Sequence, residues 1–314
     1  MSQKIVAVAG GSGSIGRSVA EAIIADGKFK VIILGRKENA ELSKAIGAPI
    51  IATDYSTVDS VVRVLEDNNV HTLISGLGLG GGVPASNEIA LLHAADRSTV
   101  TERFITSNWG VKYTQEHGKF LLSSAKVEVA AELQKVKNVE WTSVCNGLFL
   151  DYWGFPKIKS YLTPMTLVVD IAAKKAAIPG SGDVPVVFTY SEDIGKFTAA
   201  LLTLEKWDKE SYIVGDKLTW NEFLKVSEDV VGEKFDVVYD SPELLEAGGV
   251  SELPSHVPAY AFVPKEVLQG ILSSIELFFY QGDFDFGSKK TLNEVFPHLK
   301  TKSVKDVIEI GWKH

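Results

Sequence analysis

The chain has 314 residues, 45% hydrophobic and 23% charged, enough to fold into one large domain with a smaller additional part. Its 32 Lys and Arg against 40 Asp and Glu give a formal charge of -8, which argues against a nucleic-acid partner because phosphate backbones attract basic surfaces. The single cysteine, Cys145, excludes an internal disulfide. The first residues show no signal-peptide pattern, and charged residues interrupt the longest apolar stretches. We therefore expect a cytoplasmic protein that does not span a membrane.

Short β-branched apolar runs alternate with helical patterns through the first half of the chain. The first run, Ile5–Ala9, ends at a glycine cluster, and an amphipathic helix over 14–25 follows, closed by Gly27. Because parallel strands need long crossover connections, this alternation predicts an α/β fold with a doubly wound parallel sheet. The other strands predicted for this sheet are 31–34, 50–52, 72–74, 104–106 and 141–144, and a helix is predicted from about Lys119 to Lys137.

A glycine-rich loop joins the first strand to the first helix. Gly10, Gly13 and Gly16 have the spacing G-x-x-G-x-x-G. Glycines here permit a tight turn and let the backbone approach a pyrophosphate, while the helix N-terminus presents free N–H groups. A P-loop would need a lysine where Arg17 stands, so the loop predicts a Rossmann-type dinucleotide site rather than a nucleoside-triphosphatase. The residues predicted to contact the cofactor in this loop are Gly10, Ser12, Gly13, Ser14, Ile15 and Gly16.

The end of the second strand predicts which dinucleotide is bound. An acidic residue about 20 positions after the glycines favours NAD, but Arg36 and Lys37 stand there. Their side chains can pair with a ribose 2′-phosphate, which favours NADP(H). The alternative is a pair of solvated surface charges. Asp54, after the third strand, is predicted to bond the adenine amino group.

A second glycine-rich stretch, 76–82, follows the fourth strand. The ligand crevice of a doubly wound sheet lies outside the carboxyl ends of the strands, so this loop is placed where a cofactor would pass. We expect Gly76, Leu77 and Gly78 to contact it, and the alternative is a loop without contacts.

Beyond residue 150 the pattern loosens. We divide the chain into an NADP(H)-binding Rossmann domain, 1–150, and a smaller mixed α+β substrate-binding part, 151–314, of which about 186–214 return to the Rossmann sheet. Aromatic residues gather at the start of the second part, and they either face a substrate or pack as ordinary loop aromatics. These residues are Phe149, Tyr152, Trp153, Phe155 and Tyr161.

The order of several segments resembles the NmrA-like or isoflavone-reductase-like branch of the atypical short-chain dehydrogenases/reductases over nearly the whole chain. The segments are the loop 10–16 with Arg36, the stretch 104–110, Lys126, the stretch 146–149, Asp193-Ile194-Gly195, and 212–232. The resemblance implies a reductase that uses NADPH, with Lys126 as the catalytic lysine beside the nicotinamide ribose. It also implies that Ser107, Asn146, Gly147 and Phe149 line the cofactor site.

The sequence departs at several positions from the pattern of the family that it resembles. The tyrosine that ordinary short-chain dehydrogenases carry four residues before the lysine is replaced by Leu122, so no Tyr-Lys dyad is expected within that helix. Asn108 stands where relatives often have a carboxylate, and Val129 and Ala130 stand where they often have an arginine. Because of these departures, the family pattern does not predict how this chain binds its substrate.

We expect an NADP(H)-dependent oxidoreductase that reduces a small organic substrate, such as a secondary metabolite, or uses the cofactor in a redox-assisted rearrangement or cyclisation. The alternative is a regulator of the NmrA type that binds the dinucleotide to sense redox state and docks a partner protein. The six histidines are scattered without metal-ligand spacing, so no metal is expected. The sequence leaves a homodimer open.

Overall fold

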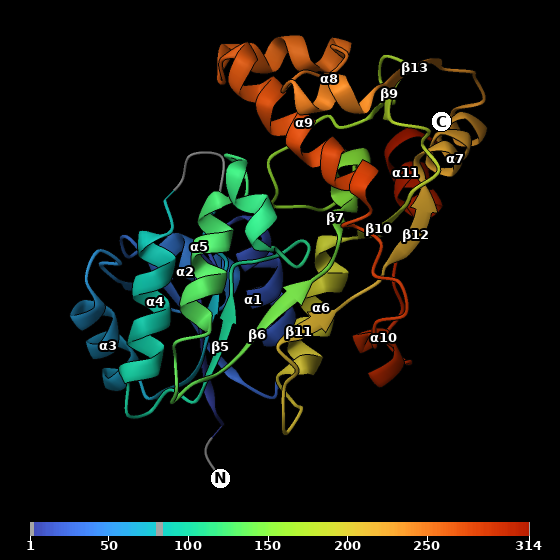
Figure 1. Ribbon diagram of the computed structural model, residues 1–314. Helices are drawn as coiled ribbons and strands as arrows, with labels where there is room; N and C mark the ends of the chain where they lie inside the picture. Colours follow the sequence, from blue (N-terminus) through green and yellow to red (C-terminus); the bar gives the residue numbers. More distant parts are fainter. Residues whose placement is uncertain (1–2, 80–83, 314) are drawn as a thin grey trace.

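The computed structural model describes residues 3–79 and 84–313, and its main feature is a parallel sheet of seven strands (Figure 1). The order β11-β6-β5-β4-β1-β2-β3 runs outward from β1 on one side and from β4 on the other, which confirms the predicted doubly wound sheet of Rossmann type. The strands are β1 (Ile5–Ala9), β2 (Lys30–Gly35), β3 (Ile50–Ala52), β4 (Val70–Ser75), β5 (Arg103–Thr106), β6 (Glu140–Cys145) and β11 (Glu210–Tyr212).

Helices cover both faces of this sheet, because successive side chains of a strand point to opposite faces. Val6 and Val8 belong to the core on the side of α1 and α6, whereas Ala7 and Ala9 belong to the core on the side of α3, α4 and α5. The helices of this part are α1 (Ser14–Asp26), α2 (Ala40–Ile46), α3 (Val58–Asp67), α4 (Ser86–Arg97), α5 (Ser124–Leu133) and α6 (Ser191–Leu201), with a 3-10 turn η1 (Gln115–Lys119) before α5.

Two smaller sheets and most of the remaining helices form a second body beside the carboxyl ends of the main strands (Figure 1). Trp153, Phe188, Trp220 and Phe223 pack against one another in its core, with ring centroids 4.8–5.9 Å apart. Its elements are β7 (Leu148–Phe149), η2 (Leu150–Trp153), β8 (Val169–Asp170), β9 (Lys175–Pro179), β10 (Pro185–Thr189), β12 (Asp216–Thr219), α7 (Trp220–Val231), β13 (Asp236–Asp240), α8 (Pro242–Glu246), η3 (Pro254–Ala261), α9 (Lys265–Gln281) and α11 (Val304–Trp312). The short helix α10 (Leu292–Val295) packs instead against α6 of the main sheet.

The segment 186–214 divides between the sheets. Strand β11 pairs in parallel with β6 at the edge of the main sheet, and α6 packs on α1, whereas β10 pairs with β12 and β7 in the second sheet. The division of the chain at residue 150 stays a prediction. Every helix within the described residues is too short or too polar to cross a bilayer.

The helix predicted over 119–137 is shorter than expected, because α5 covers only Ser124–Leu133. Phe120 adopts an extended backbone that separates α5 from η1, and its ring packs edge-on against Phe278 of α9, with centroids 5.1 Å apart. Ser123 Oγ donates to the His117 carbonyl at 2.7 Å and fixes the same break. Contacts with a distant helix therefore outweigh the local helical pattern.

Three glycines form a backbone contact where β1, α1 and β4 meet. A Cβ built on Gly16 would lie 2.6 Å from the Gly10 oxygen, and one built on Gly76 would lie 2.6 Å from the Gly16 Cα. Gly10 itself has a φ of +72°, which disfavours any other residue there. Helix α1 can start this close to the strand ends only because these side chains are absent.

We predict that Gly16→Ala destabilises the fold by about 1–3 kcal/mol, the usual cost of overpacking, although alanine favours helix by about 1 kcal/mol. Urea unfolding measures the effect. The matched control is Gly13→Ala, because a Cβ on Gly13 meets nothing within 4 Å and its φ of -161° suits any residue. Equal stability of the two variants would contradict the packing argument.

A buried carboxyl group lies in the second body. Glu276, on α9, is 1% exposed, and its Oε2 has no hydrogen-bond partner in the described residues. Burial, with a smaller contribution from the Asp240 carboxylate, raises the pKa of Glu276 well above its usual range. The protonated form therefore stabilises the fold, and this stability is lost as the pH rises from the unfolded-state pKa through the folded-state pKa.

We predict that Glu276→Gln, which stays neutral, gains stability relative to the wild type as the pH rises from 5 to 8. The readout is the difference between the two urea midpoints at each pH. The control Glu266→Gln changes an exposed glutamate of the same helix and should show no such gain. A difference that stays constant with pH would be inconsistent with a buried neutral Glu276.

Candidate active site

Helix α1 begins without a side-chain cap. Its N-cap, Gly13, has no side chain, whereas Asn39 and Thr57 at the N-caps of α2 and α3 accept backbone N–H groups. The first N–H groups of a helix lack partners within the helix and carry the positive end of its dipole. Because a Cβ on Gly13 meets no atom within 4 Å, the space before these groups is open. The geometry fits a bound phosphate.

The other residues predicted in this loop have different surroundings. The Ile15 side chain is 5% exposed and belongs to the core, so only its backbone is available to a ligand. Ser14 has a φ of 49° in the left-handed region, and its side chain lines an apolar cavity described below. Ser12 is half-buried between the glycines.

The ends of β2 and β3 border an open hollow of about 630 Å³. Arg36 and Asp54 line it, together with Thr53, Tyr55 and Asn87. The Ser56 hydroxyl and N–H hold the pKa of Asp54 below its usual range, so this carboxylate is an acceptor at neutral pH. Lys37 is exposed next to Arg36 but does not line the hollow.

The loop after β4 is held against β5. Ser107 Oγ donates to the Leu77 carbonyl at 2.5 Å, and the Leu77 N–H donates to Ser75 Oγ at 3.4 Å. Gly76 is required by its contact with Gly16, while a Cβ on Gly78 would meet nothing within 4 Å. Gly80, Gly81 and Gly82 of the predicted loop lie outside the described residues.

A buried carboxylate that the sequence analysis did not single out joins the same two strand ends. Glu88, on α4, is fully buried and accepts hydrogen bonds from the Ser75 hydroxyl, from Thr106 Oγ1 at 2.9 Å and from the Ser107 N–H at 2.8 Å. Burial raises the pKa of Glu88, and these donors oppose the shift. Its sequence signal is an acidic residue on the apolar face of α4, three positions after Ala85 and three before Leu91.

Lys126, on the first turn of α5, lies at the carboxyl end of β5. Its ammonium donates to the Asn108 carbonyl at 2.7 Å and to the Tyr113 hydroxyl at 3.4 Å. Burial lowers the pKa of Lys126 to about 8, and the Cys145 thiol and the Glu88 carboxylate oppose this shift. An ammonium with such a pKa can give up its proton near neutral pH.

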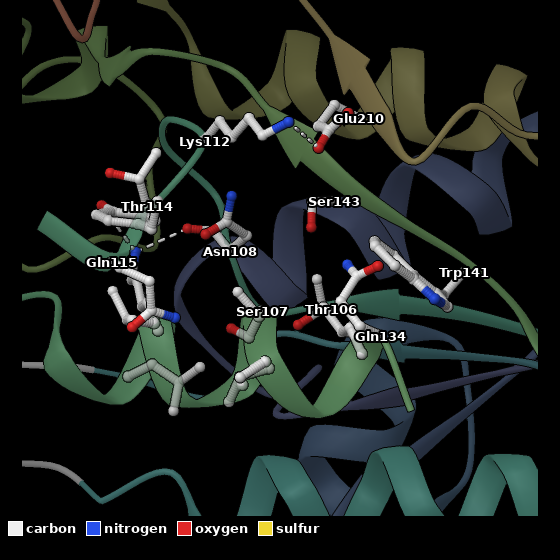
Figure 2. Close-up of a pocket in the computed structure, with 18 residues that line it drawn as sticks. Thr106, Ser107, Asn108, Lys112, Thr114, Gln115, Gln134, Trp141, Ser143 and Glu210 are labelled. Carbon is white, nitrogen blue, oxygen red and sulfur yellow. Dashed lines mark hydrogen bonds and ion pairs between the residues drawn. The ribbon is translucent and has the colours of Figure 1, made fainter. Parts of the chain in front are cut away.

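Lys126 lines a cavity of about 310 Å³ between α5, the carboxyl end of β5 and the face of β6. Figure 2 shows Thr106, Ser107 and Asn108 along this cavity, with the ion pair between Lys112 and Glu210, 2.8 Å apart, on its far side. Of the residues predicted to form the site, Ser107 and Lys126 both line this cavity. Asn108 and Tyr113 line it as well, although the sequence did not predict them as site residues.

The residues predicted after β6 lie apart from this cavity. Asn146 is fully buried, and its Oδ1 has no hydrogen-bond partner within the described residues. A Cβ on Gly147 would lie 2.2 Å from the Val187 carbonyl oxygen, so Gly147 is required by packing against β10. Phe149 lines the apolar cavity that Ser14 also lines.

The sequence matches the NmrA-like family over residues 2–304. The chain belongs to this family. Oxidoreductase BOA1 of Botryotinia fuckeliana is 32% identical over 294 residues, which are 94% of this chain and 95% of that protein. Oxidoreductase swnN of Metarhizium robertsii is 30% identical over 334 residues, 98% and 97% of the two chains. The fold resembles the binary complex of leucoanthocyanidin reductase with NADPH from Vitis vinifera, with a TM-score of 0.74, 20% identity and 97% and 98% of the chains covered.

This NmrA-like chain also has a large apolar cavity of about 760 Å³ that extends from Ser14 to α9. Four of the five gathered aromatics line it, whereas Tyr161 lies outside, stacked under Arg17 and bonded to Glu21. Phe262 at the cavity is 89% exposed. The lining aromatics of this stretch are Phe149, Tyr152, Trp153 and Phe155.

Polar groups of this cavity already have partners in the protein. The Asp170 carboxylate accepts the N–H groups of Ala173 and Ser255, and His256 Nδ1 accepts the Leu253 N–H. Within residues 3–79 and 84–313, no group of three or more His, Cys, Asp or Glu side chains is arranged to hold a metal ion.

Proposed function

We propose that the chain is an NADPH-dependent reductase that transfers hydride to a small organic substrate. The observation that carries the proposal is the position of Lys126, whose ammonium lies at the same edge of the parallel sheet as the uncapped start of α1. Dinucleotides bind across this edge in doubly wound folds. The oxidoreductase relatives and the NADPH complex of leucoanthocyanidin reductase support the same activity.

Two ends of the site fit the pyrophosphate and the ribose 2′-phosphate of NADPH. The N–H groups at the start of α1 would bind the pyrophosphate, and Arg36 in the hollow beyond β2 would bind the ribose 2′-phosphate. Asp54 in the same hollow would accept the adenine amino group. Ser12, Lys37, Leu77, Gly78, Ser107 and Asn146 complete the proposed cofactor site. NADPH, when bound, supplies hydride from its nicotinamide ring.

Lys126 would hold the nicotinamide end in place. Its ammonium can donate to a ribose hydroxyl while the Asn108 carbonyl fixes its direction. With a pKa of about 8 it is mostly protonated at pH 7, so it can also stabilise negative charge that develops on the substrate.

The apolar cavity is the proposed site for the apolar body of the substrate, and the group to be reduced would extend from it towards Lys126 in the smaller cavity. Since the carboxylate and imidazole of the apolar cavity are already bonded within the protein, this cavity offers mainly aromatic and aliphatic surface, which favours an apolar and largely aromatic substrate such as a secondary metabolite. The exposed Phe262 would be covered by such a ligand. We place the protein in the cytoplasm, where a free buried Cys145 stays reduced.

We predict that Lys126→Met lowers kcat at least about 100-fold, the usual contribution of a positioned acid or base, while NADPH still binds. A screen of carbonyl, enone and imine substrates measures turnover, and fluorescence titration measures binding. The control Lys135→Met changes an exposed lysine just after α5, which is paired with Glu132.

Unchanged turnover in Lys126→Met would contradict the role of the lysine. A wild-type protein that binds NADPH but turns over no substrate of the panel, and that captures a partner protein, would instead support the redox-sensing regulator. Net reduction forms one NADP⁺ for each molecule of product. A cofactor-assisted rearrangement forms product without net formation of NADP⁺.

We predict that Arg36→Ala weakens NADPH binding about 10- to 100-fold, since hydrogen bonds to charged groups contribute about 1.5–3 kcal/mol. NADH lacks the 2′-phosphate, so its affinity should not change. Lys44→Ala, at an exposed lysine on α2, is the control. Equal losses for both dinucleotides would contradict a 2′-phosphate site at Arg36.

A further inference from the structure

A tyrosine from the loop after β5 contacts the lysine of the proposed site. Tyr113 lines the same cavity as Lys126, and its hydroxyl oxygen lies 3.4 Å from the ammonium nitrogen. The ammonium also lies 4.8 Å from the centre of the Tyr113 ring. The two residues are 13 positions apart and belong to different elements, so no helical spacing relates them.

The Tyr113 ring is fixed by two neighbouring rings. It packs edge-on against His117 at 5.9 Å and against Phe278 of α9 at 6.5 Å. His117 is itself held, because its Nδ1 accepts the Thr114 N–H at 3.0 Å and its Nε2 faces the Asp283 carboxylate at 3.4 Å. The protein itself therefore gives the hydroxyl a defined position.

The backbone at Gly110 also lies close to the Tyr113 hydroxyl. A Cβ built on Gly110 would lie 3.3 Å from the Tyr113 oxygen, so a side chain at position 110 would crowd this group. The phenol oxygen accepts a hydrogen bond from Lys126, which leaves its own proton available for a ligand in the cavity.

We propose that Tyr113 is the proton donor of the reaction and that Lys126 assists it. The proposal rests on the reductase function proposed above. The position four residues before the lysine holds Leu122, which has no proton to give. Tyr113 instead brings a phenol to the same ammonium from a separate loop.

The transfer of charge balances as follows in a carbonyl reduction. The carbonyl carbon gains the hydride that NADPH would supply in becoming NADP⁺, and its oxygen takes the proton from the Tyr113 hydroxyl as the O–H bond breaks. The resulting phenolate takes a proton from the Lys126 ammonium, and the neutral amine regains one from water. The net change is one hydride and one solvent proton added to the substrate.

The surroundings shift the two groups in opposite directions. Burial raises the pKa of Tyr113, with smaller contributions from Cys145 and Asp283, which keeps the phenol protonated but makes it a weaker acid, so the hydrogen bond from the Lys126 ammonium is needed to stabilise the phenolate that forms. Burial lowers the pKa of Lys126, which makes its proton easier to pass on, and the Glu88 carboxylate keeps it from falling further.

The test compares Tyr113→Phe, which keeps the ring and removes the hydroxyl, with the control Tyr239→Phe at an exposed tyrosine on β13. Two substrate types are used: a carbonyl or enone, which needs a proton, and an N-methyl iminium cation, which needs hydride alone. We expect Tyr113→Phe to lower kcat for the carbonyl about 100-fold or more and to change iminium reduction and NADPH affinity less than about threefold.

Undiminished carbonyl reduction in Tyr113→Phe would overturn the donor role and leave the reductase standing. Equal losses on both substrates would also overturn it, because they indicate a structural role. A wild-type protein without any turnover would overturn the reductase and the donor role together.

A second measurement needs no turnover. The pKa of Lys126 is followed by NMR titration of labelled lysine in the wild type and in Tyr113→Phe, with the signal assigned by Lys126→Met. Loss of an acceptor should lower this pKa in the variant. An unchanged pKa would overturn the contact on which the proposal depends.

Discussion

The close backbone contact of Gly10, Gly16 and Gly76 determines the geometry of everything else in the site. It allows α1 to start directly against the ends of β1 and β4, so that its uncapped N–H groups face the crevice of the sheet. A side chain at any of the three positions would push the helix away from the strand ends. The position of the proposed pyrophosphate site, and with it the direction in which a dinucleotide would extend, follows from this contact.

A second constraint is electrostatic and comes from the buried carboxylate of Glu88 near Lys126. Glu88 joins the ends of β4 and β5 through Ser75, Thr106 and Ser107, and its charge acts on Lys126. The buried carboxylate is satisfied by donors from both strands, which is the condition under which a buried charge is tolerated. It thus fixes the loop on which Asn108 holds the lysine and tunes the lysine itself.

The sequence predicted the sheet well because its strands are buried on both faces and therefore form uninterrupted apolar runs, as in Ile5–Ala9. It also predicted the loop at Gly10–Gly16, whose glycines have a local steric cause. It did not predict that the helix begins only at Ser124, because that start depends on Phe120 packing against Phe278 of a distant helix. Tyr113 was missed for the same reason, since loop residues carry no periodicity, whereas Glu88 could have been found on the apolar face of α4.

Helix α9 contacts both halves of the proposed chemistry. Its first turns provide Leu268 and Ile271 to the apolar cavity, and its later turns provide Phe278 to the ring of Tyr113. Substitutions in the first half can reshape the cavity for another ligand without disturbing the tyrosine, whereas changes near Phe278 would disturb it. Ligand preference can therefore diverge through substitutions in the first half of α9. Substitutions in its second half are constrained by the contact between Phe278 and Tyr113.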